Sequence, residues 1–196
     1  HREVIFLNWR KLTLLVLLPL TMLSGCQTQE KYEETIHDRI HKNFSDIASY
    51  KASCTITVHA QKDHVYNAKM TYSKKDGSLR LAYDNIAITL SGADAEITKD
   101  GVSLKTKSAD TYMPIFINTF FKYYYAGEES SMDVSGVHSF GTTTLETSLS
   151  QSDTNAAGQR LWIDNETALP VKSEILKSDG TIYMEIIYKS FKFTKE

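Results

Sequence analysis

The chain has 196 residues and a nearly balanced charge, with 22 lysines and arginines against 24 aspartates and glutamates. This balance argues against a strongly basic nucleic-acid-binding domain, and no polybasic segment is present that would press the protein onto anionic lipids. The residues that follow position 25 are enough for one domain with a buried core.

The N-terminal segment has the pattern of an export signal. Arg10 and Lys11 precede a run of mostly apolar residues over 12–23. The run is too short to span a bilayer, which needs about 20 residues of helix. A basic flank, a short apolar core and small residues at its end indicate a secretory signal peptide.

The end of this segment, Leu23-Ser24-Gly25-Cys26, resembles the bacterial lipobox. In such signals the cysteine thiol receives a diacylglyceryl group and the chain is cleaved before it, here between Gly25 and Cys26. The resemblance implies a lipoprotein signal peptide over 1–25, a tether over 26–31 and a domain over 32–196, anchored to a bacterial membrane on its outer side. An ordinary signal peptide, or an apolar helix with an incidental cysteine, is the alternative.

The first element expected in the domain is an amphipathic helix over 32–50. Its apolar residues recur at intervals of three and four and form one stripe. They are Ile36, Ile40, Phe44, Ile47 and Tyr50.

The period then changes to two, which predicts about six short antiparallel strands between residues 52 and 106. Asp76-Gly77 and Asp100-Gly101 lie between such segments, and Asp-Gly pairs favour tight hairpin turns. Cys54 alternates with apolar residues, so it is expected to be a small core side chain. A regulatory or intermolecular thiol is the alternative.

A segment rich in aromatic residues interrupts the strands. Residues 113–125, MPIFINTFFKYYY, are too apolar for a solvated loop and predict one short helix with Pro114 in its first turn. Strands resume at 132–134 and 143–149, and three more are predicted over 159–164, 169–176 and 181–193. The expected fold is α+β: a single curved antiparallel sheet, an incomplete β-barrel, with an N-terminal helix and a helical lid.

The C-terminal strands carry a family resemblance. Leu161-Trp162-Ile163-Asp164, Leu169-Pro170 and the turn at Asp179-Gly180 are similar to the LolA/LolB-like lipoprotein superfamily, whose fold is an incomplete barrel with a helical lid. Within that superfamily the chain most resembles the GerS group, the germination lipoproteins of spore-forming clostridia, because it joins this hairpin to a lipobox on a short chain.

This resemblance implies a protein that is not an enzyme and needs no cofactor. Its partner would be a spore-cortex N-acetylmuramoyl-L-alanine amidase, required to make muramic-δ-lactam and hence for germination, and its location would be the developing spore envelope. Any zinc would belong to the amidase. Self-association into a homodimer stays open.

The residues themselves give no catalytic constellation. His37 and His41 have a spacing that can chelate zinc, but the glutamate of an H-E-x-x-H motif is missing, so two surface histidines are expected. No G-x-S-x-G motif, phosphate-binding glycine loop or C-x-x-C pair occurs.

Aromatic residues are therefore the candidate functional residues. They could line a pocket for acyl chains, anchor a partner interface, or cap the core of the barrel. The residues selected as pocket or interface are Phe116, Phe120, Phe121, Tyr124 and Trp162.

Two functions follow. The first is a membrane-anchored accessory protein that supports the amidase, and the alternative is a lipid or lipoprotein carrier or acceptor with an acyl-binding cavity. An envelope-stress sensor on the same fold is a third class.

Overall fold

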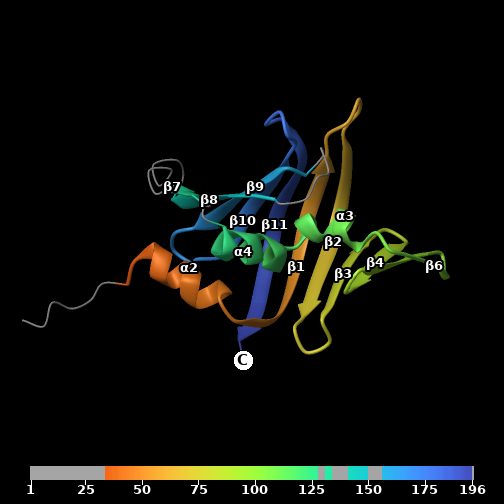
Figure 1. The fold of residues 1–196 in the computed structure, drawn as a ribbon, viewed down its shortest axis with the longest axis horizontal. Coiled ribbons are helices and arrows are strands. Elements are labelled where there is room, and N and C mark those ends of the chain that lie inside the picture. Colours follow the sequence, from red (N-terminus) through yellow and green to blue (C-terminus); the bar gives the residue numbers. More distant parts are fainter. Residues whose placement is uncertain (1–33, 128–130, 134–140, 150–155, 196) are drawn as a thin grey trace, which may run out of the picture. The chain divides into compact units, whose positions relative to one another are not determined.

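The structure, a computed structural model, describes residues 34–127, 131–133, 141–149 and 156–195 (Figure 1). These residues belong to one compact unit, Glu34–Glu196. The predicted signal peptide, its cleavage site at Gly25 and Cys26, and the tether lie outside the described residues.

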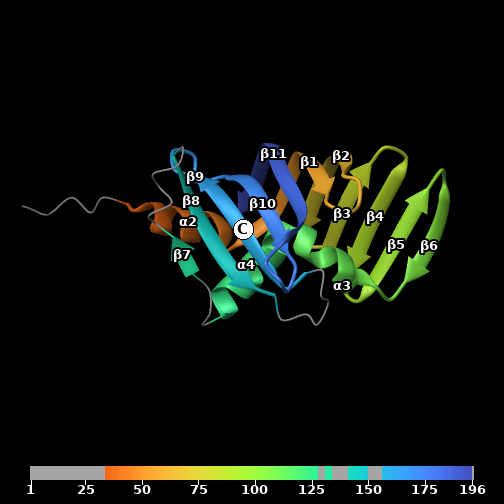
Figure 2. The ribbon, with the colours of Figure 1, turned by 90° about the horizontal axis from the view of Figure 1, so that it is seen from above.

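Within the described residues, eleven antiparallel strands form a single sheet in the order β6-β5-β4-β3-β2-β1-β11-β10-β9-β8-β7. The strands are β1 (Ile47–Val58), β2 (His64–Ser73), β3 (Ser78–Tyr83), β4 (Ile86–Ser91), β5 (Asp94–Lys99), β6 (Val102–Thr106), β7 (Ser131–Asp133), β8 (Thr142–Ser148), β9 (Gly158–Asp164), β10 (Pro170–Leu176) and β11 (Ile182–Lys195). Figure 2 shows them in one twisted row, with the helices of the middle of the chain along one face.

The sheet does not close. Its first and last strands, β1 and β11, pair along the centre, whereas β6 and β7 are the two outer strands. Strands that are consecutive in sequence pair with each other on either side of this centre. Each half is therefore a meander: β1 to β6 follow one another outward from the centre, and β7 to β11 follow one another inward toward it. The predicted curved, incomplete barrel is confirmed.

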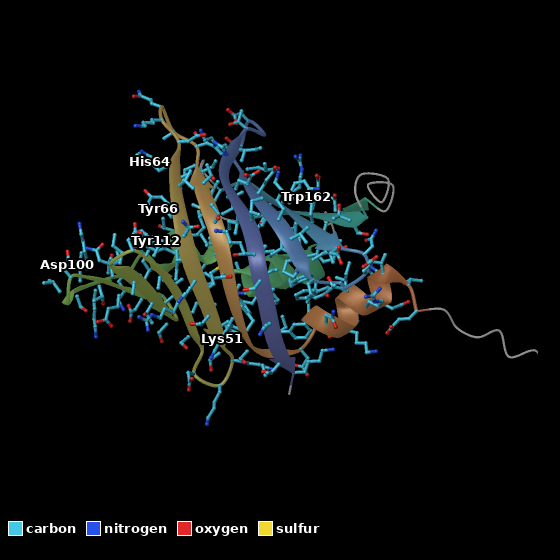
Figure 3. The ribbon with its side chains drawn as sticks, turned by 180° about the vertical axis from the view of Figure 1, so that it is seen from behind. Lys51, His64, Tyr66, Asp100, Tyr112 and Trp162 are labelled. Carbon is cyan, nitrogen blue, oxygen red and sulfur yellow. The ribbon has the colours of Figure 1, made fainter. Side chains whose placement is uncertain are left out.

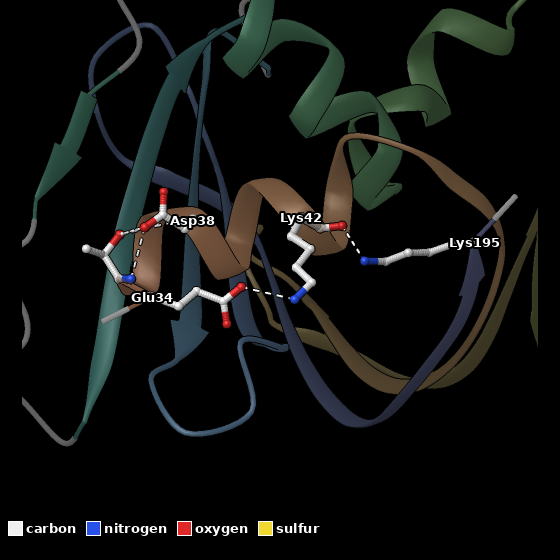
Figure 4. A network of polar contacts seen from close by, with 5 residues as sticks. Glu34, Asp38, Lys42 and Lys195 are labelled. Atoms are coloured by element: carbon white, nitrogen blue, oxygen red, sulfur yellow. Dashed lines mark hydrogen bonds and ion pairs between the residues drawn. The ribbon is translucent and has the colours of Figure 1, made fainter. Parts of the chain in front are cut away.

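The first helix of the described residues, α2 (Ile36–Phe44), is shorter than the helix predicted over 32–50. A capping box fixes its start, because the Thr35 hydroxyl accepts from the N–H of Asp38 and the Asp38 carboxylate accepts from the N–H of Thr35. Figure 4 shows these contacts together with the ion pair between Lys42 and Glu34, 3.1 Å apart.

The prediction was wrong beyond Phe44 because a β-bulge imitates helical spacing. Ile47 and Tyr50 are three apart, and in a regular strand they would face opposite sides. In β1 the register shifts between Ile47 and Ser49, which inserts one extra residue, so both side chains are buried on the same face.

Helix α2 is fastened to the turn between β9 and β10. The Arg39 guanidinium donates to the backbone oxygens of Asn165, at 2.8 Å, and Glu166. Within the turn, the Asp164 carboxylate accepts from the N–H and the hydroxyl of Thr167, and these bonds lower the pKa of Asp164. The N-terminal helix and the C-terminal hairpin therefore hold each other in place.

The aromatic segment is not the single helix predicted over 113–125. It consists of the 3-10 turn η1 (Met113–Ile115) and α4 (Ile117–Ala126), with an extended residue at Phe116, and the short helix α3 (Ala109–Tyr112) precedes it. Three consecutive side chains, Ile115, Phe116 and Ile117, are all buried. One straight helix would turn them to different faces, about 100° apart per residue, and the break at Phe116 lets all three enter the core.

Cys54 lies in the core of β1, where its Sγ is 3.7 Å from the backbone oxygen of Ala68. Burial raises the pKa of its thiol to about 12, and the nearby charge of Lys189 only partly opposes this.

We therefore expect Cys54 to resist thiol reagents at pH 8 in the folded chain and to react completely in denaturant, because only the thiolate is nucleophilic. Absorbance of a chromogenic disulfide reagent checks this on the Cys26→Ser full chain, where Cys54 is the sole cysteine. Rapid reaction of the folded chain would instead support an exposed, regulatory thiol.

Candidate functional site

Three of the predicted site residues belong to the core. Phe116 and Phe120 are fully buried, and Phe121 is 2% exposed. The Phe121 ring stacks on Phe44 of α2 at 4.3 Å between centroids, and the Phe120 ring stacks on Tyr124 at 5.7 Å. Tyr124 is half-buried at the rim of this cluster. The α4 aromatics thus fill the space between α2 and the sheet, which is the capping arrangement among the three alternatives.

Polar contacts hold the helical segment against the sheet. The Tyr50 hydroxyl donates to Oδ1 of Asn118 at 3.2 Å, and Nε2 of Gln159 donates to the backbone oxygen of Pro114 at 3.1 Å. Gln159 is buried, and the same amide also donates to Oγ of Ser173. A glutamine at an inward-facing position of β9 was a sequence sign of this role, and the predictions did not include it.

An apolar cavity of about 210 Å³ lies beside the cluster, under α3 and η1. Tyrosines surround part of it, with the rings of Tyr66 and Tyr83 at 5.0 Å between centroids (Figure 3 labels Tyr66 and Tyr112). Its lining comprises Ile56, Val58, Tyr66, Leu81, Tyr83, Ile88, Thr111, Tyr112, Pro114, Ile115, Ala156, Ile175, Tyr183 and Met184. The volume is below the roughly 300–1,000 Å³ of sites that enclose a whole small molecule.

A second hollow, of about 230 Å³, lies where α2, β1 and α4 meet. Its wall is more polar, and it includes Lys74, which pairs with Asp46 at 2.9 Å, together with Asn118 and Lys122. It does not connect the predicted aromatic residues into a site, because only Phe121 among them contributes to its lining.

Trp162 lies on the other face of the sheet (Figure 3). Its neighbours along β9, Leu161 and Ile163, are fully buried on the helix-covered face, so the alternation of the strand turns Trp162 outward. The structure therefore separates Trp162 from the four aromatic residues of the helical segment.

Trp162 borders a ladder of alternating charges on this outer face. Nζ of Lys172 lies 5.0 Å from the centre of the Trp162 ring, within the range of a cation–π contact. The same Nζ is 2.8 Å from Oε1 of Glu174 and 2.8 Å from Oε2 of Glu185. Arg160 continues the ladder to Glu146.

Lys172 is the central cation of this ladder. Burial alone would lower the pKa of its ammonium, but the hydrogen bonds to Glu174 and Glu185 outweigh burial and raise it. Glu174 and Glu185 stand directly opposite each other on β10 and β11, and like charges in such a pair repel. The Lys172 ammonium between them attracts both carboxylates and so offsets their mutual repulsion.

The described residues contain no group of three or more side chains that could hold a metal ion. His37 and His41 lie on α2, and the ring of His41 meets the edge of Tyr125 at 5.3 Å between centroids. None of the described helices is both long and apolar enough to cross a membrane.

A model of the family described as "Sporulation protein YdcC-like" matches residues 9–196 of this chain. No curated protein matches it significantly.

Several solved structures are similar. In the complex of the CwlD amidase with the GerS lipoprotein from Clostridioides difficile, the matched chain is 22% identical, with 86% of this chain and 99% of that chain covered and a TM-score of 0.48. A putative outer membrane lipoprotein-sorting protein domain from Vibrio parahaemolyticus is 11% identical over 81% of this chain and 91% of that chain, with a TM-score of 0.46. A LolA superfamily protein from Nitrosomonas europaea is 12% identical over 81% and 93%, with a TM-score of 0.40.

Proposed function

The chain belongs to the YdcC-like family of sporulation proteins, and on this premise we propose that it is a lipid-anchored, non-catalytic protein that binds and supports a spore-cortex N-acetylmuramoyl-L-alanine amidase. In this proposal it is exported and cleaved between Gly25 and Cys26, and diacylglyceryl on Cys26 anchors the domain outside the membrane. Its support of the amidase is needed for muramic-δ-lactam in the cortex and thus for germination.

The observation that carries the sporulation role is the family match, which extends from within the candidate signal peptide to the end of the chain. The proposal of an amidase as the partner rests on the resemblance of the hairpin around Trp162 and Leu169-Pro170 to the GerS group. The packing supports a protein that acts through its surface, because the α4 aromatics fill the interior and the apolar cavity under α3 and η1 is small.

We place the amidase on the outer face of β8–β11, around Trp162. A tryptophan beside an arginine and a lysine has the composition of an interface hot spot. Trp162 is the candidate residue that lies outside the helix-covered core, so a partner can reach it without unfolding the lid.

We expect Trp162→Ala to weaken amidase binding by about 2 kcal/mol or more, because truncation of a hot-spot tryptophan costs that much. The measurement is co-purification of the amidase with the tagged full chain from sporulating cells, followed by titration calorimetry. The matched control is Tyr125→Ala, an exposed aromatic on the other side of the sheet, which should bind as the unmodified chain does.

The amidase-supporting function and the binding surface around Trp162 can be rejected separately. Recovery of no amidase with the unmodified chain would reject the amidase-supporting function. Equal recovery with Trp162→Ala, Tyr125→Ala and the unmodified chain would reject the Trp162 face as the binding surface and leave the partner in place.

One observation favours a second function, a lipid or lipoprotein carrier. The cavity under α3 is apolar and is bounded by the lid, so it is the place where an acyl chain would enter. Native mass spectrometry of the full chain, released from detergent, tests this: a retained acyl ligand that is lost on Leu81→Trp would support it, and an empty cavity would reject it.

A further inference from the structure

Strand β6 forms an outer edge of the sheet and presents apolar side chains to solvent. Val102 is 73% exposed and Leu104 is 65% exposed, the highest values among the large apolar side chains of the described residues. Figure 2 shows β6 at one end of the row of strands, and Figure 3 shows Asp100, in the turn before it, far from Trp162. Edge strands of natural proteins are commonly protected by shortness, lysines, proline or bulges. Strand β6 is only five residues long and carries Lys105, but it has no proline and no bulge, and it leaves Val102 and Leu104 exposed.

The exposed side chains continue an apolar row that begins in the core. The strand register places Leu81, Ile88, Ile97 and Leu104 side by side across β3, β4, β5 and β6. Leu81 and Ile88 are buried, Ile97 is half-buried, and Leu104 is open to solvent. The apolar floor of the sheet thus reaches the edge and ends there without a covering layer.

The turn before β6 determines which backbone groups face outward. Asp100 and Gly101 both have positive φ, 50° and 80°, as the central residues of a type I′ turn. Such a turn directs the N–H of Val102 back toward Lys99 on β5. Since the direction alternates along a strand, Ser103 and Lys105 point their N–H and C=O groups away from the sheet.

We propose that β6 pairs with β6 of a second copy of this chain, antiparallel and about a two-fold axis at Leu104. Ser103 and Lys105 then exchange hydrogen bonds with the partner's Lys105 and the partner's Ser103, which satisfies all four outward backbone groups. Leu104 faces the partner's Leu104, and Val102 faces the partner's Thr106. The two sheets become one, with a continuous apolar floor.

Side-chain charge favours a second copy as the occupant. On the outer face, Lys105 of each chain stands opposite a serine of the other, so no like charges oppose each other across the axis. A symmetric, self-complementary edge is what an isologous dimer requires. Because a five-residue strand buries little area, the dimer forms at high protein concentration or where an anchor confines the chains. This inference is independent of the amidase.

Disulfide trapping tests the pairing. Facing residues in a non-hydrogen-bonded antiparallel pair have Cα atoms roughly 4.5 Å apart, which lies within the range of a disulfide. Leu104→Cys in the detergent-solubilised full chain should therefore form a covalent dimer under mild oxidation. The control is Val65→Cys on β2, which is 61% exposed but lies away from the edge. Equal cross-linking of the two variants, or none at Leu104→Cys, would overturn the proposal.

A second pair of variants removes the pairing without a thiol. Leu104→Asp sets two carboxylates against each other on the axis, whereas Val65→Asp makes the same change elsewhere. Sedimentation velocity over a wide range of concentrations should show a dimer for the unmodified chain and Val65→Asp, and its loss in Leu104→Asp. A dimer that persists in Leu104→Asp, or an unmodified chain that stays monomeric throughout, would contradict the proposal, whatever the chain's affinity for an amidase.

Discussion

Replacing Phe120 by alanine is expected to lower the free energy of unfolding by about 3–5 kcal/mol, the usual cost of truncating a buried phenylalanine. The side chain has no exposed surface, and its ring contacts Phe121 edge-on at 5.2 Å and Tyr124 by stacking at 5.7 Å. Its removal leaves a cavity under α4 that the neighbouring rings cannot fill without moving. Since small domains are stable by only about 5–15 kcal/mol, this loss is a large share of the total.

Urea denaturation of the full chain, followed by tryptophan fluorescence, measures this loss. Tyr125→Ala is the matched control on the same helix, and its 42% exposed ring predicts a loss below about 1 kcal/mol. If Phe120→Ala were as stable as Tyr125→Ala, the aromatic segment would be a loosely packed lid, and the carrier function would gain support.

Replacing Lys172 by methionine is expected to cost about 2–3 kcal/mol, somewhat less than the loss of one partner from a fully buried ion pair, because the lysine side chain is 31% exposed. Methionine keeps the apolar stem over Trp162 but removes the charge. Buried Glu174 then faces Glu185 across the strand pair without a cation between them. Arg160, at 3.6 Å from Glu174, compensates in part.

The pH dependence of this effect has a defined sign. The pKa of Lys172 is raised in the folded chain, so the stability from its contacts is present below about pH 10.5, the ordinary pKa of lysine, and is lost as the pH rises through the raised value. The difference in stability between the unmodified chain and Lys172→Met should therefore shrink above that pH.

Urea titrations at several pH values check both statements. Lys189→Met is the control, since Lys189 on the same face bonds to the neutral amide of Asn67. Adding Glu185→Gln to Lys172→Met should restore part of the loss, because it removes the opposed charge. A loss of the same size in Lys189→Met, or no recovery in the double variant, would show that the ladder does not stabilise the sheet.

Most of the sheet could be predicted from sequence because its strands alternate cleanly. The segment from Ala52 to Val58 and the Asp-Gly turns specify strand, register and hairpin locally, without tertiary information. The left-handed conformation at Gly77 and Gly101 is the one that these turns need.

The two errors have a common cause, since both occur where a long-range contact overrides local spacing. The bulge beyond Ile47 is set by pairing with β11, which is distant in sequence. The break at Phe116 is set by burial of three consecutive side chains against the sheet.

The candidate site was less predictable than the fold, because aromatic character does not tell which face of a sheet a residue occupies. Phe116, Phe120 and Phe121 could be selected by type, but their place in the core depends on where η1 ends. Trp162 stands between Leu161 and Ile163 in β9, and side chains alternate between the two faces along a strand. The position of Trp162 on the opposite face could therefore have been predicted from the sequence. The pairing of Lys172 with Glu174 and Glu185 needs the register between β10 and β11 and could not be seen in sequence.

Muropeptide analysis of spores that lack this sporulation-family protein is the most direct test of its proposed support of a cortex amidase. We expect cortex peptidoglycan without muramic-δ-lactam in the deletion strain, and the return of muramic-δ-lactam when the unmodified chain is supplied. A normal content of muramic-δ-lactam in spores of the deletion strain would reject the proposed function.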